Sequence, residues 1–302
     1  MTSNPEVPGA GRLPHWLKRK IPLVGECSRI EGAVRRRNLH TICREGLCPN
    51  RAECYSKGKV TFMMLGDRCT RHCRFCSVTK GEPAAVDPSE PERIAEAAAE
   101  LGLGHVIVTS VTRDDLPDGG ASVYAELISC LKRLDPVPVI EVLVPDFRGD
   151  LEALGLVLEA GPDIFSHNIE TVKRLFPVVR PDTDYERSLT LLAEAGRRGG
   201  ETRLKSSMML GLGETRGEVL DTMRDLREAG CHYTALGQYL RPGVDQIPVS
   251  GYIPPDDFKS YEEEGYGMGF LEVTAGPLVR SSYQENDPAR VTPECGIEDR
   301  AG

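Results

Sequence analysis

Short apolar runs alternate with longer amphipathic stretches along most of this chain. From residue 59 onward, the runs are rich in Val, Ile, Leu, Met and Phe and end at turn-forming residues, which predicts buried strands. We expect these strands at residues 60–65, 105–111, 137–144, 163–167, 203–210, 233–239 and 270–274. The amphipathic stretches between them predict helices at residues 91–101, 121–134, 150–160, 184–196 and 214–229.

Capping residues mark several helix boundaries. Asp184 and Glu214 place acidic side chains at helix starts, where the helix dipole favours negative charge. Four glycines follow predicted helix ends: Gly102, Gly161, Gly196 and Gly230. Because strands and helices alternate, we expect a parallel α/β sheet with right-handed crossovers. Six such units predict a partial (β/α)6 barrel that resembles a TIM barrel.

The two ends of the chain differ from this pattern. Residues 1–20 contain several Pro and Gly residues, and residues 21–58 give few signals of regular structure. We therefore expect an N-terminal extension over residues 1–58, irregular where it carries cysteines. The barrel is expected over residues 59–276 and a short C-terminal tail over residues 277–302.

Polar loops are expected at one rim of the barrel. Loops at residues 66–76, 112–120, 144–148 and 167–170 each follow a predicted strand. Each loop alone would be an ordinary turn. The C-terminal ends of parallel strands gather the chemistry of α/β barrels, so the shared placement of these loops predicts a site there.

The composition limits the class of protein. With 302 residues, of which 40% are hydrophobic, the chain can bury one large core. Ten cysteines occur without an apolar signal segment behind Met1 or a run long enough to span a bilayer, so we expect a reducing cytosol. Four of these cysteines are interpreted as ordinary thiols: Cys27, Cys130, Cys231 and Cys295.

Charge is distributed unevenly. The formal net charge is −9, yet residues 1–80 hold 16 Lys and Arg against 6 Asp and Glu. The acidic remainder argues against general nucleic-acid binding. The basic part includes residues 18–20 and 35–37. It is expected to dock an acidic protein partner, with a solvated surface or the neutralisation of anionic clusters as alternatives.

Six cysteines form two triplets. The first is Cys43, Cys48 and Cys54, with the spacing CxxxxCxxxxxC, and the second is Cys69, Cys73 and Cys76, with the spacing CxxxCxxC. Each triplet is one ligand short of the four that a structural zinc site or an iron–sulfur cube requires. A zinc knuckle that shares His72 or a cysteine of the other triplet is the alternative, but no CxxC or HxxxH pair follows to complete it.

The second triplet lies in DRCTRHCRFC, where the chain resembles the radical S-adenosylmethionine enzymes. The resemblance implies that the three thiolates hold a [4Fe–4S] cluster and that S-adenosylmethionine binds the fourth iron. Phe75 matches the aromatic residue that packs on the adenine in these enzymes.

Further motifs resemble the lipoyl synthase family. They are CREGLCPNRAEC, RDDLPDGGA, EVLVPDFRG, HNIETVKRLFPVVRP, GLGET, GQYLRP and RSSY, in order from Cys43 to Tyr283. The resemblance implies an auxiliary [4Fe–4S] cluster on the first triplet, with Ser282, or alternatively Ser281, as the fourth ligand. An alkoxide matches cluster iron less well than a thiolate, which suits a cluster that is dismantled as a sulfur donor. Without the resemblance, both serines would be interpreted as cap or loop hydroxyls.

The implied activity is that of a sulfurtransferase, which inserts two sulfur atoms at C6 and C8 of an octanoyl group on a carrier lysine. The implied partners are an octanoylated lipoyl carrier, such as a glycine cleavage H protein or a 2-oxoacid dehydrogenase E2 subunit, and a reductant such as ferredoxin or flavodoxin. Asn168 and Glu170 are candidates for the ribose and amino-acid part of S-adenosylmethionine, and Lys205 for its carboxylate. The alternative for each is a satisfied polar group at a strand end.

Two segments depart from the family pattern. Residues 246–249 read QIPV where HLPV is expected, so the contacts of that loop cannot be carried over, and residues 205–207 read KSS where KSG is common. Two other classes stay open. One is another two-cluster radical enzyme, such as a methylthiotransferase with an additional RNA-binding domain, for which little chain follows the barrel. The other is a cysteine-rich zinc scaffold.

Overall fold

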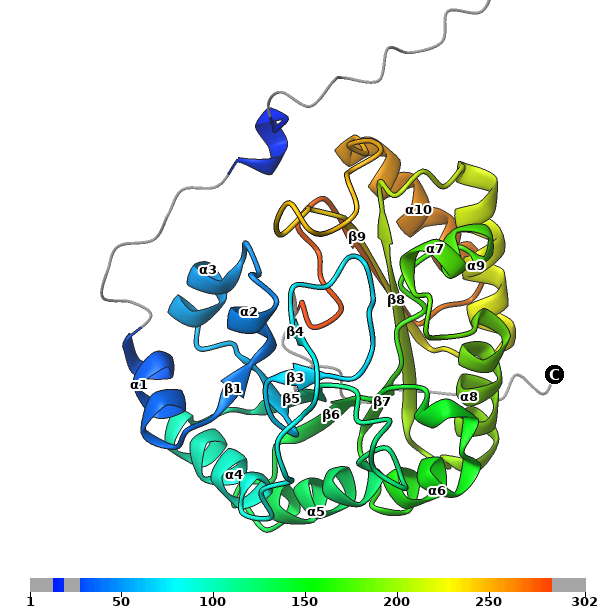
Figure 1. Ribbon diagram of the computed structural model, residues 1–302. Coiled ribbons are helices and arrows are strands. Elements are labelled where there is room, and N and C mark those ends of the chain that lie inside the picture. The colour runs from blue at the N-terminus through cyan, green and yellow to red at the C-terminus, as the bar shows by residue number, and fades with distance from the viewer. Residues whose placement is uncertain (1–12, 19–27, 284–302) are drawn as a thin grey trace, which may run out of the picture.

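A single curved β-sheet dominates the computed structural model, which describes residues 13–18 and 28–283 (Figure 1). Within these residues the sheet has eight strands in the order β1-β2-β5-β6-β7-β8-β9-β10. They are β1 (His40–Thr41), β2 (Thr61–Met64), β5 (His105–Ser110), β6 (Val139–Leu143), β7 (Ile164–Ser166), β8 (Arg203–Leu210), β9 (Tyr233–Gln238) and β10 (Glu272–Gly276). All neighbouring pairs are parallel except β1 with β2.

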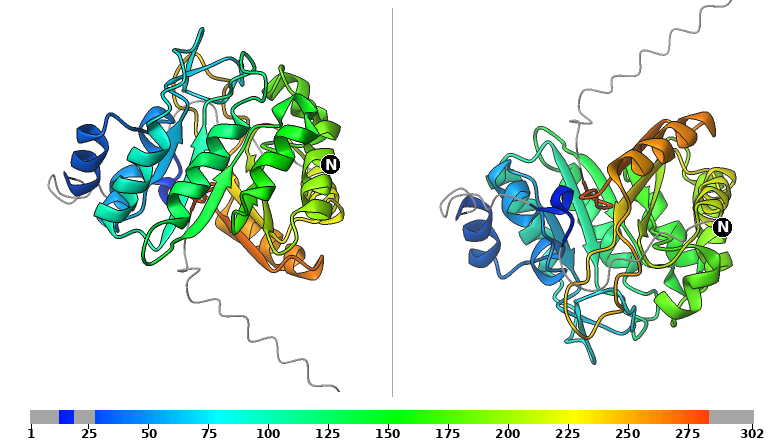
Figure 2. Two further views of the ribbon diagram at one scale, coloured as in Figure 1. Left: turned by 90° about the horizontal axis from the view of Figure 1, so that it is seen from below. Right: turned by 90° about the horizontal axis from the view of Figure 1, so that it is seen from above.

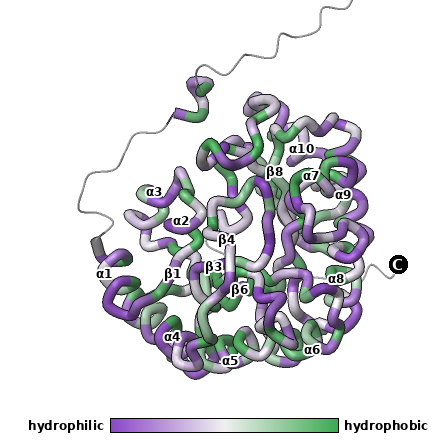
Figure 3. The backbone as a smooth tube through the Cα atoms, in the orientation of Figure 1, coloured by the Kyte–Doolittle hydropathy of each residue, from purple (hydrophilic) through white to green (hydrophobic). Residues whose placement is uncertain are grey.

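Helices connect successive parallel strands and cover the outer side of the sheet (Figures 1 and 2). They are α4 (Glu90–Leu101), α5 (Ala121–Lys132), α6 (Leu151–Glu159), α8 (Tyr185–Arg198), α9 (Arg216–Glu228) and α10 (Pro255–Gly267). Along these helices hydrophilic and hydrophobic stretches alternate, as expected for elements with one buried face (Figure 3). The described residues thus form six β/α units followed by β10, which confirms the predicted partial (β/α)6 barrel.

The described residues also form several short helices and strands outside the main sheet. They are η1 (His15–Leu17), β3 (Arg68–Cys69), β4 (Thr79–Lys80), η2 (Phe147–Gly149), η3 (Lys173–Leu175) and α7 (Phe176–Val179). Strands β3 and β4 pair in parallel as a small sheet of their own. No helix in the described part of the chain is both long and apolar enough to cross a membrane.

The cysteine-bearing part of the extension was expected to be irregular, and that expectation is wrong. It forms α1 (Ser28–Arg36), α2 (Ile42–Glu45) and α3 (Arg51–Ser56). In α1, the residues Ile30, Ala33 and Val34 recur at helical spacing and are buried. Their apolar stripe faces α4, beside which α1 lies in Figure 1. Glu31 and Gly32 between them and the arginines on either side concealed this stripe in the sequence.

Two further details correct the sequence analysis. Helix α10 was not predicted, because its buried face is narrow and is formed by Phe258, Tyr261 and Gly265. Gly265 is needed there, since a Cβ atom would lie 2.8 Å from side-chain carbons of its neighbours. Gly196 does not follow a helix end but lies inside α8, where it packs against Leu204.

Candidate active site

A cavity of about 320 Å³ opens where the parallel strands end. Strand-end residues such as Ser110, Leu143 and Gln238 line it. Cysteines of both triplets and the two tail serines also line it: Cys43, Cys48, Cys69, Cys73, Cys76, Ser281 and Ser282. Segments from both ends of the chain therefore meet at the predicted rim.

The second cysteine triplet lies on a loop that leaves β2 and is fixed on several sides. The β3–β4 pair closes the loop at its base. The backbone amide and the hydroxyl of Thr70 donate to the carbonyl of Thr112 at 3.1 and 3.0 Å. The hydroxyl of Ser77 donates to the carbonyl of Glu45 at 2.8 Å. The loop is thereby joined both to the end of β5 and to α2.

Arg71, between the first two cysteines of this loop, anchors it in the protein interior. Only 2% of Arg71 is exposed. Its guanidinium donates to both carboxylate oxygens of Asp114 at 2.7 and 2.8 Å and pairs with the buried Asp146 at 2.6 Å. Burial raises the pKa of Asp146, but the charges of Arg71 and His167, together with hydrogen bonds from Arg71 and Arg148, lower that pKa overall. Asp114 and Asp146 thus hold the loop of the second triplet in place through Arg71. The loops that carry these two aspartates therefore support the site.

The first triplet is carried by α2, by the loop after it and by α3. Thr41 begins α2 by accepting a hydrogen bond from the amide of Arg44. The hydroxyl of Thr41 also lies 2.8 Å from that of Tyr55 in α3. This contact joins the two short helices that carry Cys43 and Cys54.

The segment after β10 lies against the first triplet. Asn50, which precedes α3, donates its side-chain amide to the carbonyl of Leu278 at 2.6 Å. Arg280 lines the same cavity as Cys48. Burial lowers the pKa of Arg280, and the Cys48 thiol opposes that decrease. The tail serines therefore reach the first triplet from the opposite end of the chain. Sequence reasoning did not single out Asn50, although it lies within CREGLCPNRAEC.

Gly237 in β9 leaves room for this tail. A Cβ atom at Gly237 would lie 2.0 Å from the carbonyl oxygen of Val279, which is a backbone atom and can retreat only if the tail moves. Gly237→Ala is therefore expected to release the tail and to lower the free energy of unfolding by about 1–3 kcal/mol. Hydrogen exchange of residues 277–283 and urea denaturation would measure the two effects.

Gly217→Ala is the matched control for that experiment. Gly217 lies in α9, where a Cβ atom would meet nothing within 4 Å. Alanine there should leave tail exchange unchanged and stabilise the helix by at most about 1 kcal/mol. Equal tail exchange in Gly237→Ala and in the unmodified chain would contradict the packing argument.

Three of the residues predicted to bind S-adenosylmethionine line the cavity: Phe75, Asn168 and Glu170. Phe75 packs beside a small buried cluster that contains Val179 and Tyr239. Asn168 and Glu170 follow β7, and the Asn168 amide donates to the Glu170 carboxylate at 3.1 Å.

Arg180, which sequence reasoning did not single out within HNIETVKRLFPVVRP, completes this polar group. It is buried and donates to the backbone carbonyl of Asn168 at 2.7 Å. Burial raises the pKa of Glu170, and the charge of Arg180 opposes that rise. Asn168 Oδ1 and Arg180 Nε are buried without a hydrogen-bond partner among the described residues. Such unpaired atoms are rare in folded proteins, so this wall fits a polar ligand.

The structure does not bring Lys205 to this group. Lys205 lies inside β8 and pairs with the buried Glu141 at 2.9 Å. Glu141 also accepts a hydrogen bond from Ser166 at 3.0 Å. Lys205 is not among the described residues that line the cavity. This geometry corrects the expected contact with a ligand carboxylate in favour of the alternative, a satisfied polar group within the sheet.

The QIPV segment contacts the second triplet although its sequence departs from the family pattern. The side-chain amide of Gln246 donates to the carbonyl of Cys76 at 3.3 Å. The amide of Ile247 donates to the carbonyl of Arg74 at 3.0 Å, and the hydroxyl of Tyr239 donates to the carbonyl of Ile247 at 2.8 Å. Gln246 therefore supports the cluster loop at the position where histidine was expected.

The donor atoms fit two separate thiolate-held groups. Among the described residues, no three Cys, His, Asp or Glu side chains are already arranged as a metal site. Burial, together with the neighbouring thiols of Cys48 and Cys43, raises the pKa of Cys54 to about 11. Burial also raises the pKa of Cys73 to about 11, with Arg180 lowering it and Cys76 raising it. The thiols thus interact within each triplet, and both sets offer the soft sulfur donors that iron–sulfur clusters use.

Two cysteines outside the triplets lie within the described residues, and neither lines the cavity. Cys130 and Cys231 are buried free thiols. Cys27 and Cys295 lie outside the residues that the structure describes.

Comparisons with known proteins identify the class. Residues 63–226, which begin in β2 and include the second triplet, match the model of the radical SAM superfamily. The chain has the fold and cysteine loop of a radical S-adenosylmethionine enzyme. Residues 4–48 match the model of the N-terminal domain of lipoyl synthase. With the relatives described next, this match shows that the chain belongs to the lipoyl synthase family.

Two curated relatives are named lipoyl synthase. That of Thermus thermophilus is 52% identical over 273 residues, which cover 90% of this chain and 84% of the relative. That of Caldanaerobacter subterraneus is 52% identical over 272 residues, covering 90% and 95%. Among solved structures, Streptococcus suis SuiB bound to S-adenosylmethionine superposes with a TM-score of 0.53 at 11% identity, over 75% of this chain and 53% of that chain. The last likeness concerns the fold alone.

Proposed function

We propose that this chain inserts two sulfur atoms at C6 and C8 of a protein-bound octanoyl group to form the lipoyl cofactor. The observation that carries the proposal is that cysteines of both triplets, Cys43 and Cys48 of the first and all three of the second, line one cavity with the two tail serines. A hydrogen-abstracting group and a sulfur donor must reach the same alkyl carbons, and a shared cavity meets that requirement. Membership of the lipoyl synthase family supports the same conclusion.

The proposal assigns one [4Fe–4S] cluster to each triplet. S-adenosylmethionine would bind at the cluster of Cys69, Cys73 and Cys76, and Ser282, or alternatively Ser281, would complete the auxiliary cluster of Cys43, Cys48 and Cys54. When bound, these groups supply a 5′-deoxyadenosyl radical that takes hydrogen from unactivated C–H bonds and the sulfur that replaces it. No side-chain acid, base or nucleophile can break such bonds.

The chain's own residues would bind S-adenosylmethionine, orient the octanoyl chain and exclude water. Phe75, Asn168 and Glu170 are the proposed contacts of S-adenosylmethionine, on the wall that holds unpaired polar atoms. Met63 and Met208 give the same cavity apolar surface against which an octanoyl chain can pack. Exclusion of water from this space protects a carbon radical from side reactions.

The proposal includes an organisation and partners. Residues 1–58 and 277–302 would serve the auxiliary cluster, and residues 59–276 the radical chemistry. The acyl carrier would be a glycine cleavage H protein or a 2-oxoacid dehydrogenase E2 subunit, and the electron donor a ferredoxin or flavodoxin. A reducing cytosol would protect the thiolate ligands from oxidation.

Anaerobically reconstituted protein is expected to hold about eight irons per chain, because each triplet has its own set of ligands. With dithionite, S-adenosylmethionine and an octanoyl-lysine peptide, it should form a peptide that carries two sulfur atoms and release 5′-deoxyadenosine. Iron, sulfide and zinc analysis with mass spectrometry would measure these outcomes. A protein that contains zinc and no acid-labile sulfide would instead support the zinc scaffold.

A further inference from the structure

Two arginines of the basic N-terminal part form ion pairs with carboxylates of the same chain. Arg36 and Arg37 both pair with Glu100 of α4, and Arg37 also pairs with Glu96 at 3.4 Å. These ion pairs connect α1 to α4. The two helices lie side by side in Figure 1. Of residues 35–37, Arg36 and Arg37 therefore have charged partners within the molecule.

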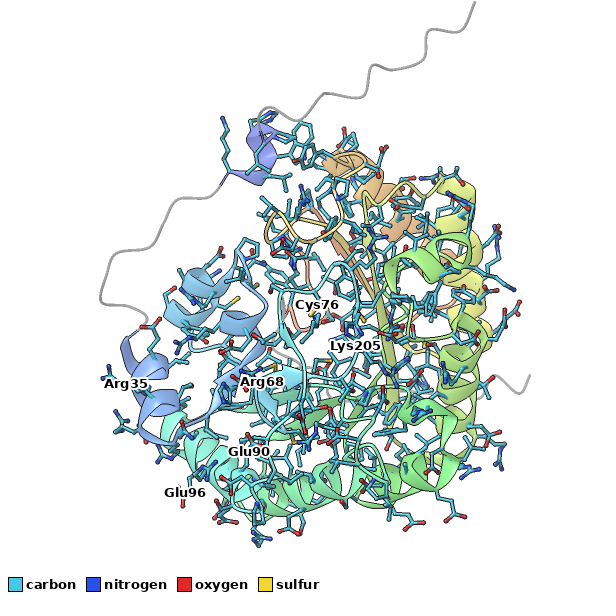
Figure 4. All side chains as sticks on the ribbon, in the orientation of Figure 1. Arg35, Arg68, Cys76, Glu90, Glu96 and Lys205 are labelled. Atoms are coloured by element: carbon cyan, nitrogen blue, oxygen red, sulfur yellow. The ribbon has the colours of Figure 1, made fainter. Side chains whose placement is uncertain are left out.

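Three other basic residues are sequence neighbours of residues that line the cavity, namely of Cys43, Cys69 and Cys73. Arg44 in α2, Arg68 in β3 and Arg74 in the second triplet are exposed, and no ion pair engages them within the described residues. Figure 4 shows Arg68 toward the centre of the molecule, on the same side as Cys76, whereas Arg35 projects from the outer edge. The unpaired charges thus lie near the cluster loop.

Hydrogen bonds join the loop of the second triplet to α2 on one side and to the segment after β9 on the other. The bond from Ser77 to Glu45 connects the second triplet to the end of α2, next to Arg44. The bond from Ile247 to the carbonyl of Arg74 connects the same loop to the segment after β9. The three segments therefore form a continuous rim.

Two large apolar side chains are exposed on this rim. Leu47, at the end of α2, is 60% exposed and also lines the cavity. Val244 is 84% exposed, and its carbonyl accepts a hydrogen bond from the guanidinium of Arg241. Pro242, two residues before Val244, lines the cavity as well. Exposed apolar groups beside unpaired charges are a feature of surfaces that bind proteins.

We propose that this rim, formed by Arg44, Leu47, Arg68, Arg74 and Val244, docks an acidic carrier domain that presents its acyl-lysine to the cavity. The inference rests on the proposed function, which requires an acyl chain held by another protein. Residues 81–302 contain 21 Lys and Arg against 40 Asp and Glu, so most of the barrel repels an acidic partner. The basic rim is where attraction and access to the cavity coincide.

Charge reversal at the rim tests this proposal. Arg44→Glu and Arg68→Glu should each raise the KM for an octanoylated carrier domain about 3- to 10-fold at low salt, and less as salt screens the charges. Turnover of a short, uncharged octanoyl-lysine peptide, and the iron content, should stay unchanged. Arg35→Glu is the matched control, because it makes the same charge change on the outer edge and should leave both KM values unaltered.

Each contrary outcome has a distinct meaning. Equal KM values for the rim variants and the unmodified chain would overturn the docking surface. So would an equal effect of Arg35→Glu, which would indicate net charge alone, or a parallel loss of peptide turnover, which would indicate that the arginines stabilise the clusters. If the unmodified chain placed no sulfur in the peptide, the proposed function would fail instead.

Discussion

Replacing Cys73 by alanine is expected to abolish cleavage of S-adenosylmethionine, and with it every later step. Cys73 lies at the centre of the second triplet, on a loop whose position Arg71 fixes through the carboxylates of Asp114 and Asp146. The loop should keep its place in the variant, because those ion pairs do not involve the thiol. What is lost is one of the three proposed cluster ligands, and of that triplet only Cys69 and Cys76 still line the cavity.

The measurement is 5′-deoxyadenosine, detected by liquid chromatography with mass detection after reduction with dithionite. Cys130→Ala is the matched control: it removes a thiol that is buried outside both triplets and bonds to Glu126. This control should cleave S-adenosylmethionine at the normal rate. Cleavage by Cys73→Ala at the same rate would show that the second triplet does not hold the radical cluster.

The sequence predicted the barrel well because its strands are buried on both faces. Strand β2 is buried throughout, and its apolar run was recognisable without any neighbour. Elements at the edge gave weaker signals. Helix α1 is stabilised by arginines that reach Glu96 and Glu100 some sixty residues away, and no local pattern shows such a partner.

For the candidate site, the sequence predicted which loops share the rim but not what their side chains do. Asp114 and Asp146 were expected at the ends of strands, and they are there, yet they hold Arg71 and do not line the cavity. Lys205 belongs to the opposite case, since only the fold shows that Glu141 is its partner. A motif identifies a segment of the site. Which partner a buried charged side chain pairs with depends on residues distant in sequence.

The tail illustrates the same point through packing. RSSY is recognisable as letters, but its position depends on Asn50 and on the missing side chain of Gly237. Neither residue carries chemistry of its own. Together they bring Ser281 and Ser282 into the cavity that Cys43 and Cys48 also line. The structure thus explains how the tail reaches this cavity, which the letters of the motif do not show.

Cys48→Ala is expected to separate the two proposed clusters. Cys48 belongs to the first triplet and lies near Arg280 of the tail. The second triplet is held by contacts to β5, to α2 and to Asp146, none of which involves the Cys48 side chain. The variant should therefore still release 5′-deoxyadenosine in the presence of an octanoylated carrier, while it forms no product that contains sulfur.

Ser282→Ala should fall in the same class, since only the auxiliary site loses a proposed oxygen ligand. Ser281→Ala is the matched comparison, because both serines line the cavity and differ by one position along the tail. The serine whose loss abolishes sulfur insertion is the ligand. Mass detection of 5′-deoxyadenosine and of the carrier peptide measures both outcomes in one assay. If Cys48→Ala inserted sulfur normally, the first triplet could not hold the sulfur donor, and the two-cluster account of this cavity would fail.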